Sequence, residues 1–535
     1  MKTYRRLVSR VLPALSLALL ACSAAPEDGA NGEAISTTSQ ASWLSCGTGE
    51  SDLCAPTGHG EVKCVCTPNT TWTPLAQTPG SGADAMWLMD DGTVLALLDS
   101  DSKSLSKLTP SSTGSYANGT WASAGSMLLA KRFFASQVLS TGQLVSCGGE
   151  YTGPGLPQTE SGFCEVYDPG VELSVQVTEP PGWGAIGDSP STVLPNGEML
   201  MGNTQGMGNQ AALLNPSSQA WTIVGGDSDN EEGYVLLQTG DVLTANVYNQ
   251  GSERYTSASA AFIADAPVPV VLGANSEIGP GTVMMDGRVI WFGASGHTAI
   301  YTPVAGQQGS WVAGPDMPVV NGDALVASDV PALLEPNGRV LVVGQGATSA
   351  SAQFIEYVPA SNSFALVGSY GPSGFNDNEY VRMLLLPNGH ALVSFWSGQW
   401  FDVAFSTGPE PQWAPTITSF PSTVDQSATV TLSGTQLCGL SEVSTYGDDN
   451  QQAENYPMVR LTSSTGAVTY LNANGVSTRS IAPNQAGSVS VDIPSNLAVG
   501  SYTLNVVAMG IPSNSVAVQV VKGRIVVHPG GVGAR

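Results

Sequence analysis

One short pattern returns seven times along the chain: a turn that contains glycine, followed by a run of apolar residues. The turn glycines are Gly92, Gly142, Gly197, Gly240, Gly287, Gly338 and Gly389. Successive glycines are 50, 55, 43, 47, 51 and 51 residues apart. A near-constant period of this length is typical of folds in which each repeat forms one small sheet and the sheets stack around an axis. The repeat therefore predicts an all-β fold built on a seven-bladed β-propeller.

The residues around each turn support strands rather than helices. Asn-Gly and Asp-Gly pairs adopt the positive φ angles that a tight hairpin needs. The runs at 93–98, 288–292 and 339–343 are rich in Val, Leu and Ile, which favour strands. Most repeats also carry a later strand, a turn with Pro and an aromatic residue. A generic β-sandwich with many hairpins is the alternative, and the constant spacing argues against it.

Composition excludes one class of partner. The chain has 535 residues with 62 Gly and 35 Pro, and only 11% are charged. Its 43 acidic residues outnumber 18 basic ones, so the net charge is −25. Such a surface repels nucleic acid, so we expect no nucleic-acid partner.

The N-terminus reads as an export signal over residues 1–21. Basic residues are followed by an apolar run, 11–20, that is too short to span a membrane. The end of this run, residues 19–22, resembles the lipobox of bacterial lipoproteins, which makes Cys22 the expected lipidation site. Residues 22–44 are small and polar, as a flexible tether is. An ordinary cleaved signal with an accidental Cys is the alternative. We therefore expect a protein of the bacterial cell envelope, at the outer membrane or cell surface, held to the membrane by a lipid anchor.

Cysteine usage agrees with an oxidising compartment. A Cys-rich segment, 45–70, holds four cysteines that are enough for two disulfides of undetermined pairing: Cys46, Cys54, Cys64 and Cys66. A zinc site is the alternative, although paired CxxC motifs are missing. Cys147 and Cys164 flank the loop between two neighbouring strands, where a cross-strand disulfide is expected. Cys438 is left as a buried free thiol.

Two domains follow the Cys-rich segment. The propeller is expected over residues 71–413. A change to short alternating strands then predicts an immunoglobulin-like β-sandwich over 414–522, and 523–535 reads as a tail.

The two domains in this order resemble the galactose oxidase family, or more broadly kelch-type propellers followed by an early-set domain. The phrases that carry the resemblance are 314–318 with 334–344 in the propeller, and 459–470 with 493–513 behind it. The resemblance covers roughly residues 70–521. It implies an architecture, and function has to be argued from the site.

The oxidases of that family hold copper with two His and two Tyr, one Tyr being cross-linked to a Cys. In this chain the corresponding positions lack these residues. The Tyr-His pair is replaced by a stretch with Glu379, Tyr380 and Arg382, and the second His by Tyr470. The cross-linked Tyr corresponds to the stretch at 132–134, which is Arg132, Phe133 and Phe134, and no Cys occurs at 82–86. The stacking Trp falls near Tyr151.

Histidine is also scarce: the four are His59, His297, His390 and His528, and no pair has ligand spacing. Copper(II) prefers imidazole, so neither a metal site nor a cofactor is predicted. The acidic loop 227–233 is read as a solvated turn, with calcium binding as the alternative. Trp396 and Trp400 depart from the repeat pattern; they are read as core, with sugar stacking as the alternative.

The preferred function is a non-catalytic envelope lipoprotein whose kelch-like propeller binds a glycan or a surface protein at its mouth. The candidate ligand-binding residues are Arg132, Phe134, Tyr151, Glu379, Tyr380, Arg382 and Tyr470, because aromatics and Arg suit stacking and hydrogen bonding. The alternatives are an enzyme related to the carbohydrate oxidases with an altered active site, or a hydrolase that uses carboxylates. A purely structural envelope protein is a third possibility.

Overall fold

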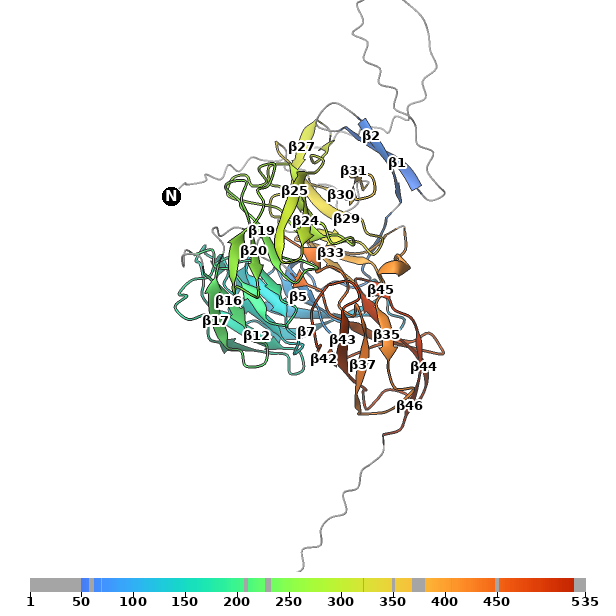
Figure 1. Cartoon of the computed structure of the whole chain (residues 1–535). Coiled ribbons are helices and arrows are strands. Elements are labelled where there is room, and N and C mark those ends of the chain that lie inside the picture. Colours follow the sequence, from blue (N-terminus) through green and yellow to red (C-terminus); the bar gives the residue numbers. More distant parts are fainter. Residues whose placement is uncertain are drawn as a thin grey trace, which may run out of the picture. The chain divides into compact units, whose positions relative to one another are not determined.

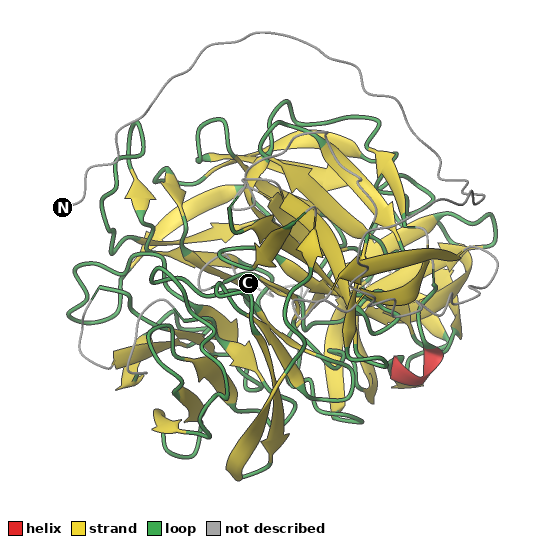
Figure 2. Cartoon of the chain, turned by 90° about the horizontal axis from the view of Figure 1, so that it is seen from above, coloured by secondary structure: helices red, strands yellow, loops and turns green. Residues whose placement is uncertain are grey.

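A computed structural model describes residues 50–56, 62–68, 70–205, 210–226, 232–320, 322–348, 352–367, 381–405, 407–447 and 452–523. For 50–56 and 62–68 only the backbone is described. Their regular secondary structure consists of strands and one short 3₁₀ turn, η1 (Pro411–Trp413) (Figure 1, Figure 2). No helix in this part of the chain is long and apolar enough to cross a membrane.

Seven successive groups of four strands, which we number blades 1 to 7, occupy residues 71–404 of the described chain. Blades 1 to 3 consist of β4 (Ala83–Leu88), β5 (Val94–Leu98), β6 (Ser104–Thr109), β7 (Thr120–Ser126); β9 (Ala135–Val138), β10 (Leu144–Cys147), β12 (Cys164–Asp168), β13 (Leu173–Val177); and β14 (Ser191–Val193), β15 (Met199–Met201), β16 (Gln210–Leu214), β17 (Trp221–Gly225). Blades 4 and 5 consist of β18 (Val235–Leu236), β19 (Val242–Ala245), β20 (Ser252–Thr256), β21 (Ala261–Ala264); and β22 (Gly281–Val283), β23 (Val289–Phe292), β24 (Thr298–Val304), β25 (Gln307–Ala313). Blades 6 and 7 consist of β28 (Ala332–Leu334), β29 (Val340–Gly346), β30 (Ala352–Val358), β31 (Ser363–Leu366); and β32 (Val381–Leu385), β33 (Ala391–Phe395), β34 (Trp400–Ala404) with β3 (Thr71–Pro74).

The blades close into a ring. The innermost strands contact their neighbours in the order β9, β14, β18, β22, β28, β32 and β4, and Trp87 Nε1 on β4 donates to Ser136 Oγ on β9 at 3.0 Å. The first strand of the chain in this region, β3, pairs with β34 of the last blade, with Thr71 opposite Ala404. This pairing joins the two ends of the ring and leaves no open sheet edge between them. The prediction of an all-β propeller is confirmed, and the sandwich alternative is wrong for residues 71–404.

Each repeat glycine lies in the turn between the first and second strand of its blade. All seven have φ between +76° and +89°, a region that only glycine adopts without strain. Each donates its N–H to the carbonyl three residues earlier at 2.8–2.9 Å. We call the face that carries these turns the base of the propeller, and the opposite face, where the innermost strands begin, the mouth.

Residues 416–521 form two sheets that share one apolar core. The sheets consist of β35 (Thr416–Ser419), β37 (Thr429–Thr435), β43 (Ala486–Asp492), β42 (Ala473–Asn474); and β36 (Thr423–Asp425), β46 (Val516–Val521), β44 (Gly500–Ala508), β40 (Met458–Ser463), β41 (Val468–Leu471), β45 (Ile511–Pro512). Leu432 and Val489 of one sheet belong to the same buried cluster as Leu504 and Val459 of the other. The result is a β-sandwich, drawn in orange to red in Figure 1. The immunoglobulin-like assignment and the domain limits stay predictions.

One segment of the sandwich leaves it and lies among the innermost strands of the propeller. This segment, residues 441–447 and 452–456, contains β38 (Val443–Thr445) and β39 (Gln452–Ala453), and we call it the central hairpin. Strand β38 pairs with β28, with Ala332 opposite Thr445, and also contacts β22 and β32. Strand β39 contacts β9 and β14. The axis of the ring is therefore filled by protein.

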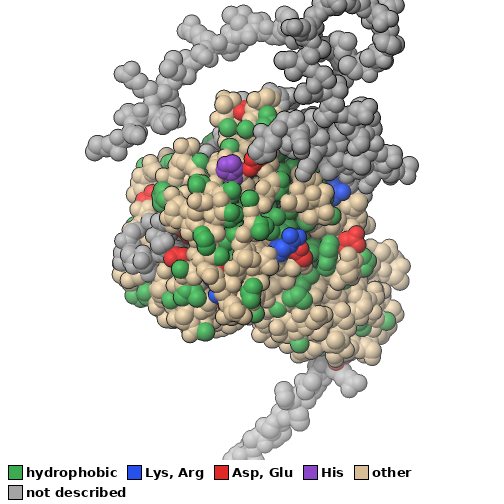
Figure 3. All heavy atoms as spheres, turned by 45° about the horizontal axis from the view of Figure 1, so that its top comes forward, with side chains coloured by type: hydrophobic (Ala, Val, Ile, Leu, Met, Phe, Trp, Pro, Cys, Tyr) green, Lys and Arg blue, Asp and Glu red, His purple; other side chains and the backbone are tan. Residues whose placement is uncertain are grey.

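Smaller strands add to the periphery: β8 (Lys131–Arg132) with β11 (Tyr151–Thr152), β26 (Val319–Val320) with β27 (Asp323–Val326), and β1 (Glu50–Pro56) with β2 (Val62–Pro68). In the β1–β2 hairpin the backbone of Cys54 is opposite that of Cys64. Cys22 and Cys46 lie outside the described residues, and so do the side chains of Cys54, Cys64 and Cys66. Acidic and basic side chains are scattered on the face shown in Figure 3.

The remaining cysteines follow the sequence prediction. Cys147 on β10 is the register partner of Cys164 on β12, and the two form a disulfide. Cys438 is free and buried.

Candidate functional site

The central hairpin is fixed to the blades through buried polar groups. Thr192 Oγ1 donates to Glu442 Oε1, and the Leu236 N–H donates to Glu442 Oε2 at 2.8 Å. Ser444 Oγ donates to the Glu454 carboxylate within the hairpin. Burial raises the pKa of Glu442 to about 7 and that of Glu454 to about 8. Both carboxyls are therefore largely neutral at mildly acidic pH.

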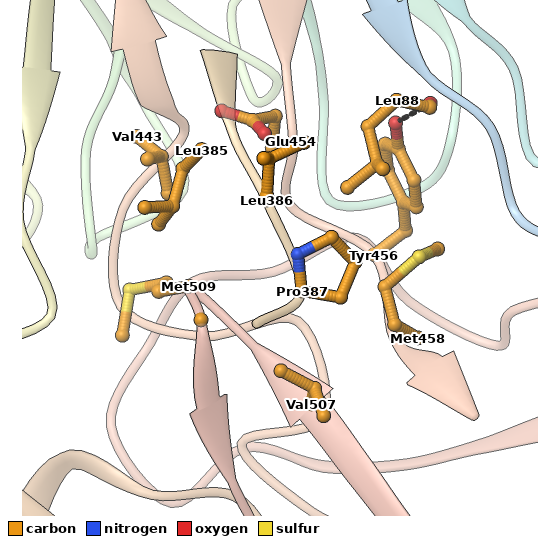
Figure 4. Close-up of a pocket in the computed structure, with 11 residues that line it drawn as sticks. Leu88, Leu385, Leu386, Pro387, Val443, Glu454, Tyr456, Met458, Val507 and Met509 are labelled. Carbon is orange, nitrogen blue, oxygen red and sulfur yellow. Dashed lines mark hydrogen bonds between the residues drawn. The ribbon is translucent and has the colours of Figure 1, made fainter. Parts of the chain in front are cut away.

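A buried arginine of the sandwich holds the other arm of the hairpin. Arg479 donates from Nε to the Asn455 carbonyl at 2.7 Å and from Nη1 to the Val138 carbonyl of blade 2 at 3.1 Å. Its guanidinium lies 4.6 Å from the centre of the Tyr456 ring, and Tyr456 OH donates to the Leu88 carbonyl of blade 1 (Figure 4).

The pocket in Figure 4 has room for about 10 Å³, which is about one water molecule. It is too small for an organic ligand.

At the mouth, three blades meet around one arginine. Arg132 donates from Nε to Asp84 Oδ2 at 3.2 Å and to Ser102 Oγ at 2.9 Å. Its Nη2 donates to the Asp99 carbonyl at 3.0 Å. The guanidinium also lies 4.9 Å from the centre of the Trp396 ring, which blade 7 contributes and which is 41% exposed. We call these five residues the Arg132 cluster.

A second aromatic pair borders this cluster. Tyr151 on β11 is the register partner of Arg132 on β8. The Phe133 ring meets the Tyr151 ring edge to face, with centres 5.9 Å apart. Phe133 has φ +51°, which is uncommon for a bulky residue and marks a constrained backbone. The Glu150 N–H donates to the Phe133 carbonyl at 3.1 Å and so supports this conformation.

A second arginine lies deeper. Arg382 donates from Nε to the Asp84 carbonyl at 2.6 Å and from Nη1 to the Val381 carbonyl at 3.0 Å. Its guanidinium stacks 4.7 Å from the centre of the Tyr446 ring, at the tip of the described part of the central hairpin. Arg382 and Tyr446 are both buried. They support the floor of the mouth rather than offer contacts to a ligand.

Burial raises the pKa of both carboxyl groups in the Arg132 cluster. Burial raises the pKa of Asp84, against the opposing effects of Arg132, Ser102 and Arg382. Burial and the nearby Asp84 raise the pKa of Asp99 to about 6. The charge of the cluster therefore becomes more positive as the pH falls below about 6, because Asp99 takes up a proton.

The structure does not bring all the predicted site residues together. Arg132, Tyr151 and Arg382 lie near one another at the mouth. Phe134 is fully buried in the core, 6.4 Å from the ring centre of Trp87. Tyr470 lies at the base, where its ring would meet any side chain placed at Gly92. Both are therefore remote from the exposed surface of the cluster.

Other predicted positions have mixed outcomes. Glu379 and Tyr380 lie outside the described residues, as does the first part of the acidic loop 227–233. Both Trp residues are predicted to belong to the core. Trp400 is 1% exposed, which agrees with this prediction, whereas Trp396 is 41% exposed, so the prediction is wrong for Trp396. Sequence reasoning does not assign Asp84, Asp99, Ser102 or Tyr446 to the mouth, because no recognisable motif surrounds them.

The donor groups at the mouth do not fit the copper site that the resemblance implies. Guanidinium groups of Arg132 and Arg382 take up the hydrogen-bonding capacity there, and copper requires neutral or anionic donors. His297 lies on blade 5, where its Nδ1 is 2.8 Å from Asp316 Oδ1. His390 is on blade 7 at the base, paired with Asp402. Among the described residues no group of three or more His, Cys, Asp or Glu has a metal-binding arrangement.

Comparisons with known proteins give no family. No family model and no curated protein matches the chain. Among solved structures, a fungal alcohol oxidase of the AA5 family, in complex with copper, covers 84% of this chain and 99% of its own at 14% identity and a TM-score of 0.49. A catalytically inactive virginiamycin B lyase from Staphylococcus aureus covers 63% and 99% at 11% identity and a TM-score of 0.44. The extracellular domain of a hybrid two-component system from B. thetaiotaomicron covers 88% and 62% at 9% identity and a TM-score of 0.42. At these values none of them carries an argument about what this chain does.

Proposed function

We propose that this chain is a non-catalytic carbohydrate-binding protein whose ligand lies against Trp396 at the mouth of the propeller. One observation carries the proposal: a large indole ring that is 41% exposed is held in place by the guanidinium of Arg132. Large exposed aromatic rings in a fixed orientation are suited to stacking against the apolar face of a sugar ring.

The arrangement also provides polar contacts. Asp84, Ser102 and the Asp99 carbonyl hold Nε and Nη2 of Arg132, while Nη1 makes no hydrogen bond within the described residues. That group is therefore available to a ligand hydroxyl or carboxylate without rearrangement. Because the guanidinium is already ordered, binding costs less side-chain entropy than it does for a mobile arginine. The half-buried Tyr151 borders the same surface.

The same contacts argue against a catalytic role for these carboxyls. Asp84 is buried and engaged by Arg132, so it does not face a substrate. A carbohydrate oxidase with an altered site, or a hydrolase using carboxylates, would need a reactive group at the exposed surface, and the Arg132 cluster presents an indole and a guanidinium there. Asp99 accepts the Gly82 N–H at 3.1 Å and supports the turn.

The proposal includes attachment to the bacterial cell envelope through a lipid on Cys22, with the kelch-like propeller displayed beyond the tether. Its support is the N-terminal sequence, which lies outside the described residues. Intact-mass analysis of membrane fractions tests this part: a Cys22→Ser variant is expected to lose the acyl mass and the membrane association. Membrane association that persists in that variant would contradict it.

The binding proposal is tested with a glycan array followed by calorimetry on the best sugar. Trp396→Ala is expected to lower affinity at least tenfold, because the stacking surface is removed while the fold remains. Tyr248→Ala is the matched control, since Tyr248 is a 59% exposed aromatic in the corresponding loop of blade 4. Equal affinity of Trp396→Ala and the unaltered protein for every bound glycan would refute the assignment. A copper content of one per chain would instead favour the oxidase alternative.

A further inference from the structure

A second, separate cavity lies at the base of the propeller. It is an open pocket of about 350 Å³ between blades 1 and 2 and the sandwich. Its walls come from three segments: Asp90 of blade 1, the turns of blade 2 that contain Gly142, Gln143 and Asp168, and Asn472 and Asn474 of the sandwich. The volume falls in the range of sites that hold a small organic molecule, about 300–1,000 Å³. We call it the base cavity.

The lining of the base cavity combines carboxylates with side-chain amides. Asn474 donates its amide to Asp492 Oδ2 at 3.2 Å, and Gln143 donates its amide toward Asp168 Oδ2 at 3.4 Å. Each contact uses one N–H of an amide, and the Asn474 carbonyl oxygen and the carboxylates are acceptors. A ligand that matches these acceptors has to bring donors of its own.

The base cavity also carries uncompensated negative charge. No Lys or Arg is among its lining residues, and within the described residues neither Asp90 nor Asp168 forms an ion pair. Two further carboxylates, Asp91 and Asp492, act on Asp90 from nearby. A ligand with a positive charge would relieve this repulsion.

Among the lining residues, Asp90 is the one whose carboxylate a positively charged ligand would stabilise most. Asp90 is only 8% exposed, and the neighbouring Asp91 and Asp492 add negative charge around its carboxyl group. Burial, with the charges of Asp91 and Asp492, raises the pKa of Asp90 to about 7. Its Oδ2 lies 2.7 Å from the place where a Cβ at position 142 would be, so the glycine there leaves room for the carboxylate at the cavity wall.

We propose that the base cavity binds a protonated amino sugar, with its ammonium group between Asp90 and Asp168 and its hydroxyls on the asparagine side. The charge and the acceptor oxygens of the lining select an ammonium group, and the volume selects a molecule larger than a bare ion. This site is independent of the one at Trp396, because the two lie on opposite faces of the propeller.

The test is calorimetry at pH 7 with glucosamine, and with glucose as the uncharged probe of the same size. Glucosamine is expected to bind at least tenfold more tightly than glucose. Asp90→Asn and Asp168→Asn are each expected to weaken glucosamine binding at least tenfold. Asp90→Asn keeps the shape of the side chain and removes a buried charge, so it is expected to fold. Asp286→Asn, the same exchange in an exposed turn of blade 5, is the matched control and is expected to bind normally.

Two further arms separate the outcomes. Trp396→Ala is expected to bind glucosamine as the unaltered protein does, whatever happens to the ligand at the mouth, so the two sites fail or succeed separately. Equal affinity for glucosamine and glucose would overturn the proposal. So would glucosamine binding that Asp90→Asn leaves intact, or calcium binding that Asp90→Asn abolishes in a protein that does not bind glucosamine.

Discussion

The central hairpin makes the stability of this fold depend on pH through Glu454. The carboxyl is buried between the blades, and its pKa rises from an ordinary value of 4.5 to about 8 because burial disfavours the charged form. The folded chain therefore holds a proton at Glu454 between about pH 4.5 and 8, whereas the unfolded chain has released it. This contribution to stability is fully present below pH 4.5 and is lost as the pH rises through about 8.

The size of the effect follows from the two pKa values. Each pH unit between them corresponds to about 1.36 kcal/mol, so the interval from 4.5 to about 8 corresponds to about 5 kcal/mol of unfolding free energy. Glu454→Gln stays neutral at every pH and keeps an oxygen for the Ser444 hydroxyl. The variant is expected to match the unaltered protein at pH 4.5 and to be more stable by up to about 5 kcal/mol above pH 8.

Urea unfolding followed by tryptophan fluorescence at pH 4.5, 6.5 and 8.5 measures this difference. Glu442 and Asp90 also have raised pKa values of about 7, but both are present in the two proteins and cancel when the variant is compared with its parent. The reasoning is refuted if the unfolding free energies of variant and parent change in parallel between pH 4.5 and 8.5.

Two further predictions concern the same scaffold. Replacing Cys147 and Cys164 together by Ala opens a loop with a sequence separation of 17; it is expected to lower the unfolding free energy by about 3 kcal/mol, and an unchanged urea midpoint would contradict the estimate. Arg479→Met removes a buried cation that satisfies the carbonyls of Asn455 and Val138. Each of the two buried carbonyls left without a donor is expected to cost about 1–3 kcal/mol of unfolding free energy, and thermal unfolding of a variant as stable as its parent would show that the central hairpin is held by other contacts.

The parts of the fold that the sequence predicts are those with local causes. A glycine at Gly92 or Gly338 is needed because the backbone there has positive φ, and a strand has to follow because the chain reverses. Each of these requirements involves only a few consecutive residues, so the blades can be predicted from the sequence. The pairing of Cys147 with Cys164 is similar, because the two strands are neighbours in the chain.

The sequence does not predict the central hairpin in this way. Glu442 and Glu454 look like charged residues of a surface loop, and nothing near them in the chain shows that Thr192 and Leu236, more than 200 residues earlier, will surround one of them. Their burial depends on the closed ring. The prediction that Tyr470 lies at the mouth is wrong for the same reason. The segment that reaches the axis precedes strand β41, so Tyr446 lies at the mouth and Tyr470 at the base.

Local backbone geometry explains why Arg132 lies at the mouth while Phe134, two residues later, is buried in the core. Arg132 and Phe134 are two residues apart and would share one face of a regular strand. The positive φ of Phe133 interrupts the alternation, so the Arg132 side chain stays at the mouth and Phe134 enters the core beside Trp87. A pattern of residue types does not reveal such a residue, because non-glycine residues adopt this conformation rarely.

The filled axis bears on where the two proposed ligands can bind. A ring with an open centre offers its channel, but here the central hairpin occupies the channel and hydrogen-bonds to the blades. Both proposed binding surfaces accordingly lie on the faces of the propeller. Strand β4 carries Asp84 near the mouth and is followed by Asp90 at the base, so the same blade contributes to both. At the mouth the carboxylate is engaged by Arg132, which leaves a guanidinium and an indole for the ligand. At the base no cation accompanies Asp90, which leaves negative charge. The two proposed sites therefore differ in charge, and losing one is expected to leave the other unchanged.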